Sequence, residues 1–139
     1  MSKKKFKILI VASNFYSNIT SKMIISAEEE LKKNKCSFDI LRVNGSLEIP
    51  TMIAIKLKKN KYDGAIALGC IIKGQTNHNE VIANTIATSL VNISVENLKP
   101  VGNAVLSCNN LTQALVRTKG SKNRPAEAVN AIISVLDNI

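Results

Sequence analysis

The chain has one histidine, His78, placed where an apolar run stops and a helical pattern starts. Asn77 can cap that helix while Glu80, three residues later, returns the bond, as in a capping box. His78 then takes the first helical position, where the positive helix end attracts phosphate and disfavours a protonated imidazole. We therefore expect a neutral His78 that transfers protons near pH 7. A surface histidine without a chemical role fits this position equally well.

Other residues that could do chemistry lie in turns predicted to follow strands. Gln75 and Thr76 precede the same helix and can donate to an anion. Phe15 follows the first apolar run, although its position is more typical of a core residue that caps a sheet than of a stacking platform. Glu48 can simply complement a helix dipole, and Arg117 can serve as a cation at a helix end.

Sequence motifs exclude several classes of enzyme. No GxSxG, Walker loop, GxGxxG or metal-ligand spacing occurs, so serine hydrolysis, nucleoside triphosphate chemistry and metal-dependent hydrolysis are not indicated. The cysteines, Cys36, Cys70 and Cys108, are odd in number and far apart, which predicts reduced thiols and neither disulfides nor a zinc site.

Length and composition indicate one globular domain over residues 1–139. Hydrophobic residues make up 45% and charged residues 21% of the chain. The longest apolar runs are too short to span a bilayer, and no cleavage site follows the basic start, so we expect a cytoplasmic protein without a membrane partner. The net charge of +9 could attract nucleic acid, but the lysines gather at helix ends and only 4% of residues are aromatic. Nucleic acid is therefore not expected as a partner.

The elements that must position these residues alternate along the chain. Apolar runs predict strands over 6–12, 37–43, 63–72 and 101–107, and amphipathic patterns predict helices over 18–34, 47–59, 79–95, 111–118 and from Pro125 onward. Ser17 or Asn18 can cap the first helix. The last helix should turn Ala128, Ile132, Val135 and Ile139 inward.

The order βαβαβαβαα predicts an α/β fold with a four-stranded parallel sheet covered by helices on both faces. Ligands of such sheets bind beyond the carboxyl ends of the strands. The turns at 13–17, 44–48, 69–78 and 107–110 should therefore meet on one edge.

These turns, taken in order, resemble those of the 6,7-dimethyl-8-ribityllumazine synthase family. The motifs that carry the resemblance are NF (14–15), VNGSLEIP (43–50), YDGAIALGCIIKGQTNH (62–78), QALVR (113–117) and KNRP (122–125). The third is long and highly specific, and together they cover nearly the whole chain. The resemblance implies a flavodoxin-like, three-layer α/β/α fold.

The resemblance also implies an activity. Such an enzyme condenses 5-amino-6-(D-ribitylamino)uracil with 3,4-dihydroxy-2-butanone 4-phosphate, without a cofactor. Its active sites lie between neighbouring subunits of a homopentamer, which can assemble further into a sixty-subunit shell. The residues that would recognise phosphate and those that would stack on the uracil ring should therefore come from different chains.

Individual roles follow from the same resemblance. Phe15 would stack on the pyrimidine, and His78 would transfer protons. The residues expected to contact the ring and ribityl chain are Ser46, Leu47, Glu48, Cys70, Ile71 and Ile72, with Asn103 beside the pyrimidine. The residues expected to hold the phosphate are Gln75, Thr76 and Arg117.

Several positions depart from the family pattern. Asn14 stands for the usual Arg, Tyr16 for Asn, Leu47 for Phe, and Asn103 for an aromatic residue. These changes concern the pyrimidine side. They leave open a second hypothesis, a non-catalytic flavin or pterin binder on the same scaffold.

Overall fold

The computed structural model describes residues 6–74 and 78–139. Their elements in chain order are β1 (Lys7–Ser13), α1 (Ser17–Lys33), β2 (Ser37–Val43), the 3-10 helix η1 (Ser46–Glu48), α2 (Ile49–Lys59), β3 (Gly64–Ile72), α3 (His78–Asn97), β4 (Val101–Cys108), α4 (Leu111–Val116), the 3-10 helix η2 (Gly120–Lys122) and α5 (Arg124–Leu136). The predicted order βαβαβαβαα is confirmed. The helix predicted over 47–59 is divided, because its first turn is the separate 3-10 helix η1.

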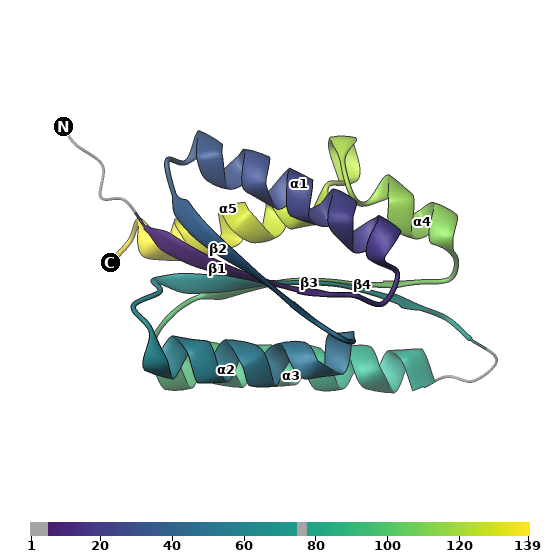
Figure 1. The fold of residues 1–139 in the computed structure, drawn as a ribbon, viewed down its shortest axis with the longest axis horizontal. Helices are drawn as coiled ribbons and strands as arrows, with labels where there is room; N and C mark the ends of the chain where they lie inside the picture. Colours follow the sequence, from purple (N-terminus) through teal and green to yellow (C-terminus); the bar gives the residue numbers. More distant parts are fainter. Residues whose placement is uncertain (1–5, 75–77) are drawn as a thin grey trace.

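The four strands form one parallel sheet in the order β2-β1-β3-β4. Helices α1, α4 and α5 lie on one face of the sheet, and α2 and α3 lie on the other (Figure 1). This is the predicted flavodoxin-like, three-layer arrangement. The central strands β1 and β3 are buried over most of their length, as expected for continuous apolar runs between two helical layers.

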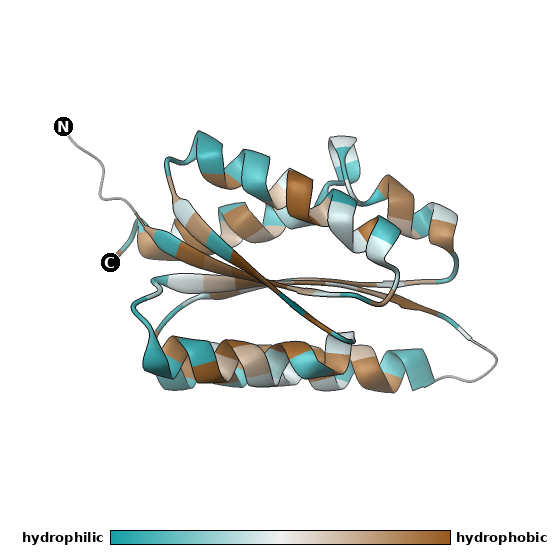
Figure 2. Ribbon diagram, in the orientation of Figure 1, coloured by the Kyte–Doolittle hydropathy of each residue, from teal (hydrophilic) through white to brown (hydrophobic). Residues whose placement is uncertain are grey.

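Apolar packing on each face of the sheet holds the helices in place. Figure 2 shows apolar residues concentrated along the strands. In α1 the apolar residues spaced four apart form an inward stripe whose members are fully buried: Ile19, Met23, Ala27 and Leu31. On the opposite face, Ile86 and Leu90 of α3 are buried, with Ile82 and Ile93 packed partly buried beside them. Both layers therefore use the four-residue spacing visible in the sequence.

The start of α1 differs from the prediction. The helix begins at Ser17, and the cap residue is Tyr16, whose backbone is left-handed (φ 56°, ψ 51°) and whose side chain makes no capping hydrogen bond. Neither Ser17 nor Asn18 caps the helix, so that expectation is wrong. The backbone N–H groups of Asn14 and Phe15 donate to carbonyls at the end of β2, at 2.7 and 3.0 Å. These bonds hold the turn against β2, so the chain reverses at Tyr16.

The inward face predicted for the last helix is only half right. Ala128 and Ile132 are buried, but Val135 is 49% exposed and Ile139 is 88% exposed. Each residue advances an α-helix by about 100°. Viewed down the helix axis, the buried residues of α5 share one centre line, and Val135 is rotated roughly a quarter-turn away from that line. Ile139 lies beyond the helix end. The other buried members of the stripe are Pro125, Val129, Ile133 and Leu136.

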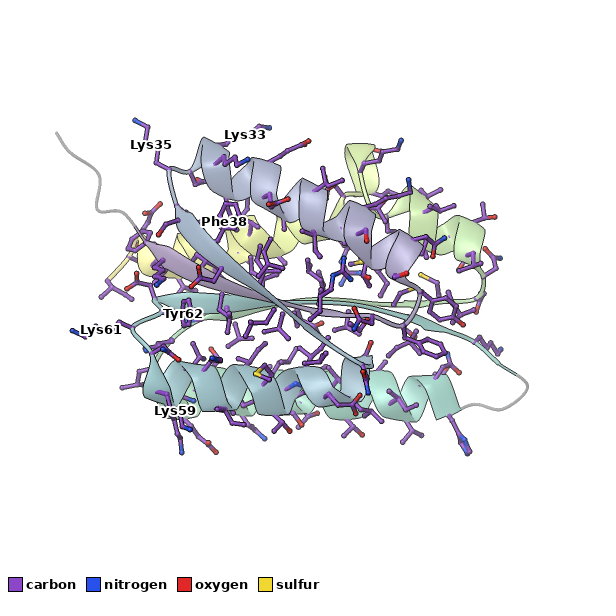
Figure 3. The ribbon with its side chains drawn as sticks, viewed as in Figure 1. Lys33, Lys35, Phe38, Lys59, Lys61 and Tyr62 are labelled. Atoms are coloured by element: carbon purple, nitrogen blue, oxygen red, sulfur yellow. The ribbon has the colours of Figure 1, made fainter. Side chains whose placement is uncertain are left out.

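At the amino end of the sheet, polar side chains are paired with one another. The Tyr62 hydroxyl donates to Oδ2 of Asp39 at 2.6 Å, and Nζ of Lys7 lies 3.5 Å from the same oxygen. We call Lys7, Asp39 and Tyr62 the amino-end cluster. The last turns of α1 and α2 add lysines, as predicted, and Figure 3 shows labelled lysines around Tyr62 at this end. Among the described residues, no helix is both long and apolar enough to cross a bilayer.

Candidate active site

A crevice opens where β1 and β3 separate. Their pairing ends at Ala12 and Leu68, whereas β3 continues beside β4 as far as Ile72. The chain leaves β1 for α1 on one face of the sheet, and α3 follows β3 on the other face. The last residues of β3 therefore keep a free edge, at the switch point where parallel α/β sheets bind ligands.

A pocket of about 350 Å³ lies at this edge. Its lining comes from the first three predicted turns and α3: Phe15, Tyr16, Gly45, Ser46, Leu47, Glu48, Cys70, Ile71, Ile72 and Ile82. The pocket brings together every residue that the resemblance assigned to the ring and ribityl chain, with the exception of Asn103. It also includes Tyr16, Gly45 and Ile82, for which no site role was expected. For Ile82 there was a usable signal, because it lies one helical turn after His78.

Phe15 is presented to the pocket by the first turn. Its side chain is 63% exposed, so the interpretation of Phe15 as a core residue is wrong. Its ring meets the Tyr16 ring edge to face, with centroids 4.8 Å apart and planes at 88°. Tyr16 packs in turn against the core beside α1. The left-handed cap thus turns one aromatic ring inward and leaves the other available for stacking.

The guanidinium of Arg42, on β2, stabilises this turn by hydrogen bonds. It donates to Oγ of Ser21 at 2.9 Å, to Oγ1 of Thr20 at 3.4 Å and to Oδ1 of Asn14 at 3.5 Å. These bonds join the end of β2 to the first turn of α1. Nothing in the sequence near Arg42 indicates these partners, so the contact could not be predicted.

The second turn places a carboxylate and a hydroxyl at the pocket. Oε1 of Glu48 accepts a hydrogen bond from the backbone N–H of Gly45 at 2.8 Å, which fixes the short helix η1. Ser46 is buried against β3, where a Cβ on Gly69 would lie 2.5 Å from the Ser46 hydroxyl oxygen. Only glycine allows η1 to approach β3 this closely.

The cysteines near the pocket are neutral thiols. Burial raises the pKa of Cys70 to about 12, and the neighbouring Cys108 adds to the shift. Burial also raises the pKa of Cys108, although the positive charges of Arg117 and Arg124 oppose it. Cys36, Cys70 and Cys108 are all free, which confirms the prediction of reduced thiols. Cys70 therefore forms part of an apolar wall and is a poor nucleophile.

His78 is the first residue of α3, as predicted, and its side chain is exposed. It precedes the pocket residue Ile82 by one helical turn, which puts both on the same side of the helix. Gln75 and Thr76, expected to bind phosphate, and Asn77, expected to cap the helix, lie outside the described residues. In the described part of the chain, no group of three His, Cys, Asp or Glu side chains could hold a metal ion.

Arg117 and Asn103 do not line the pocket of their own chain. Arg117 ends α4, and its Nη1 donates to the backbone carbonyl of Gln113 at 2.8 Å. Asn103 is exposed on β4, at the edge of the sheet, and its Oδ1 accepts from the backbone N–H of Val105 at 2.9 Å. The structure thus gathers the aromatic half of the expected site but leaves these two residues apart from it.

The chemistry of the pocket suits a flat ring with polar edges. Aromatic and aliphatic side chains supply most of the wall, and Ser46 and Glu48 supply a hydroxyl and a carboxylate. An imidazole stands one helical turn from the wall, at the start of α3. Mostly apolar pockets with a few converging polar groups are typical of small-molecule sites.

Comparisons with known proteins agree on one family. The family model described as 6,7-dimethyl-8-ribityllumazine synthase matches residues 5–139. A relative of that name from Bartonella henselae is 37% identical over 136 residues, covering 96% of this chain and 88% of its own. One from Afipia carboxidovorans is 38% identical over 136 residues, covering 94% and 83%. A third, 6,7-dimethyl-8-ribityllumazine synthase 1 from Rhodopseudomonas palustris, is 36% identical with the same coverage.

Proposed function

The chain belongs to the 6,7-dimethyl-8-ribityllumazine synthase family, and on this premise we propose how its strand ends carry out the reaction. The enzyme condenses 5-amino-6-(D-ribitylamino)uracil with 3,4-dihydroxy-2-butanone 4-phosphate. The products are 6,7-dimethyl-8-ribityllumazine, phosphate and water, and the reaction is the penultimate step of riboflavin biosynthesis. The relatives, which are named for synthase activity, give the non-catalytic hypothesis no support.

The observation that carries the site assignment is the pocket beside the free edge of β3. Phe15, exposed and backed by Tyr16, stacks on the pyrimidine ring. The neighbouring wall residues contact the ring and the ribityl chain: Ser46, Leu47, Glu48, Cys70, Ile71 and Ile72. Asn103, which also belongs to the proposed site, reaches the pyrimidine from a neighbouring chain.

Phosphate binding and proton transfer are assigned to residues at the rim of this pocket. His78 transfers protons, and Arg117 binds the phosphate by charge-assisted hydrogen bonds. For Gln75 and Thr76, the proposed phosphate contacts rest on the family resemblance alone. The start of α3 adds the positive end of a 20-residue helix, which favours a departing phosphate.

The reaction needs proton transfer at each stage. The uracil amine attacks the ketone carbon and forms a carbinolamine, which loses water to give an imine. Phosphate then leaves, and the enol that remains tautomerises to a ketone. The ribitylamino nitrogen attacks this carbonyl carbon, and loss of a second water closes the second ring. His78 accepts the proton released by the attacking amine and returns protons to the departing oxygen.

A homopentamer with shared active sites accounts for the separation of Arg117 from its own pocket. The outer face of α3 also exposes apolar side chains, among them Val81 (63%), Val91 (61%) and Val95 (67%). Such a stripe fits burial against another copy of the chain. Sedimentation should give five times the chain mass, or sixty times if pentamers assemble into a shell.

We further propose a cytoplasmic location, which cell fractionation tests.

The direct test mixes purified protein with both substrates and follows the absorbance of the lumazine product. Turnover must exceed the uncatalysed rate of the same mixture. Tight riboflavin binding without turnover would favour the non-catalytic hypothesis, and the proposed site would then lose its chemical role.

A further inference from the structure

The segment that carries Arg117 is short and tied to its surroundings at several points. The backbone N–H of Arg117 donates to the carbonyl of Ala114 at 3.0 Å, and its carbonyl accepts from the N–H of Arg124 at 2.9 Å. Beyond it the chain is exposed from Lys119 to Ser121. The guanidinium itself donates to the Gln113 carbonyl, so the part of this segment whose anchor is still to be found is the backbone between Arg117 and the exposed turn.

Thr118 has the position such an anchor needs. It is fully buried although it lies between a half-buried arginine and an exposed lysine. Its hydroxyl donates to the carbonyl of Leu115 at 2.7 Å, which closes the end of α4. Its own carbonyl accepts a hydrogen bond from the hydroxyl of Ser26 on α1, 92 residues earlier in the chain.

The bond from Ser26 is unusual for a serine in the middle of a helix. Such a hydroxyl commonly returns to a carbonyl of its own helix. Ser26 is buried and instead reaches the segment after α4, which Figure 1 places on the same face of the sheet as α1. A buried carbonyl must find a donor, so this contact fixes the backbone immediately after Arg117.

We propose that Ser26 is a positioning residue, which holds Thr118 and thereby aims Arg117 at the phosphate substrate. The inference rests on the proposed function of Arg117. Helix α1, which carries Ser26, begins directly after Tyr16, a residue of the pocket wall. One helix therefore positions two of the parts that a protomer contributes to active sites: its aromatic turn and its arginine.

The test replaces Ser26→Ala and measures the KM of each substrate separately. The KM for the phosphate substrate, the butanone phosphate, should rise about tenfold, while the KM for the uracil substrate stays within about twofold. Amide hydrogen exchange over residues 117–120 should accelerate, because the backbone has lost its anchor.

Ser94→Ala is the matched control. The Ser94 hydroxyl also donates from a helix to the carbonyl of a residue beyond the helix end, Lys99, at 2.8 Å. It lies at the opposite end of the sheet from Arg117. This variant should leave both KM values and the exchange of residues 117–120 unchanged.

Arg117→Ala is measured in parallel. If Arg117→Ala raises the KM for the phosphate substrate and Ser26→Ala does not, the positioning role is overturned and the phosphate assignment stands. The positioning role is also overturned if Ser26→Ala only lowers the melting temperature, or if exchange of residues 117–120 is unaltered. An unchanged KM in Arg117→Ala overturns the phosphate assignment and, with it, the inference.

Discussion

The two ends of the sheet differ in how their side chains are satisfied. At the amino end, the amino-end cluster of Lys7, Asp39 and Tyr62 pairs hydroxyl, carboxylate and ammonium with one another. Both ion pairs found among the described residues lie at this end, the second joining Lys33 and Glu30. At the carboxyl end, two large apolar side chains of the pocket wall are exposed: Phe15 is 63% exposed and Leu47 is 52% exposed.

We infer from this difference that the amino end of the sheet contributes to stability and the carboxyl end to ligand binding. The polar side chains of the amino-end cluster find their partners within the chain, so changes to them should alter stability. Groups at the carboxyl end are held in place by hydrogen bonds to the scaffold but keep their faces free, as binding sites require. Substitutions at the two ends should therefore affect different measurements.

The largest effect is expected from His78→Ala. Loss of the proton carrier should lower kcat about a hundredfold and leave the KM for both substrates nearly unchanged. Lys59→Ala, an exposed change at the amino end, is the control and should alter neither constant. Steady-state kinetics checks this. A KM that rises in step with the fall in kcat would assign His78 to binding instead.

Arg117→Ala should have the next largest effect. A lost charge-assisted contact to phosphate should raise the KM for the phosphate substrate about thirtyfold, with a smaller change in kcat. The KM for the uracil substrate serves as the internal control. Equal loss for both substrates would contradict the division of roles between Arg117 and the pocket.

Phe15→Ala separates the two possible roles of that ring. Because Phe15 is largely exposed, the substitution should leave the melting temperature within about 2 °C while raising the KM for the uracil substrate about tenfold. Kinetics and thermal melting test this together. A large drop in melting temperature with unchanged KM would restore the interpretation of Phe15 as a core residue.

The smallest effect is expected at the amino end, from Tyr62→Phe. Loss of the bond to Asp39 should lower the melting temperature by about 3 °C at pH 7 and leave the kinetics unchanged. Altered kinetics without a thermal shift would contradict the assignment of this end to stability.

The effect of Tyr62 also depends on pH. Burial, followed by the hydrogen bond and charge of Asp39, raises the pKa of Tyr62 to about 12 in the folded chain. The folded pKa exceeds the unfolded value of about 10, so the stabilisation is complete below pH 10 and is lost as pH rises toward 12. The gap in melting temperature between wild type and Tyr62→Phe should narrow over that window.

The difference in melting temperature between wild type and Tyr62→Phe should also narrow at low pH. The hydrogen bond from Tyr62, with help from Lys7, holds the pKa of Asp39 below its usual value. A depressed carboxyl pKa stabilises the fold above the unfolded value, and that contribution is lost as pH falls through the folded one. Melting curves of both proteins from pH 6 down to pH 2 test whether this difference becomes smaller as predicted.

The sequence predicted the scaffold better than the site. Four-residue spacings such as Ile19 to Leu31 report which side of a helix is buried, because burial follows local periodicity. The position of Phe15 after a buried strand led to the wrong prediction of a core residue. Its exposure depends on the left-handed backbone of Tyr16 and on hydrogen bonds to the end of β2. The individual pocket roles came from the family resemblance, which adds information that periodicity lacks.

Contacts between distant segments lay beyond the reach of sequence patterns. Ser26 and Thr118 are 92 residues apart, and Tyr62 and Asp39 are 23 apart. Nothing in the local sequence around any of these residues indicates its partner. Such pairs form only once the parallel sheet has set the distances between elements.

The central claim, that each active site combines the pocket and His78 of one protomer with Arg117 of its neighbour, is tested most directly by mixed oligomers. His78→Ala and Arg117→Ala chains are co-expressed in equal amounts, and activity is compared with each variant alone. Activity is measured at a concentration of the phosphate substrate far below its KM, where each variant alone is nearly inactive. If assembly is random, about a quarter of the interfaces combine an intact pocket with an intact Arg117, so activity should recover to roughly a quarter of wild type. Activity that stays at the mean of the two variants would show that each site is completed within one chain.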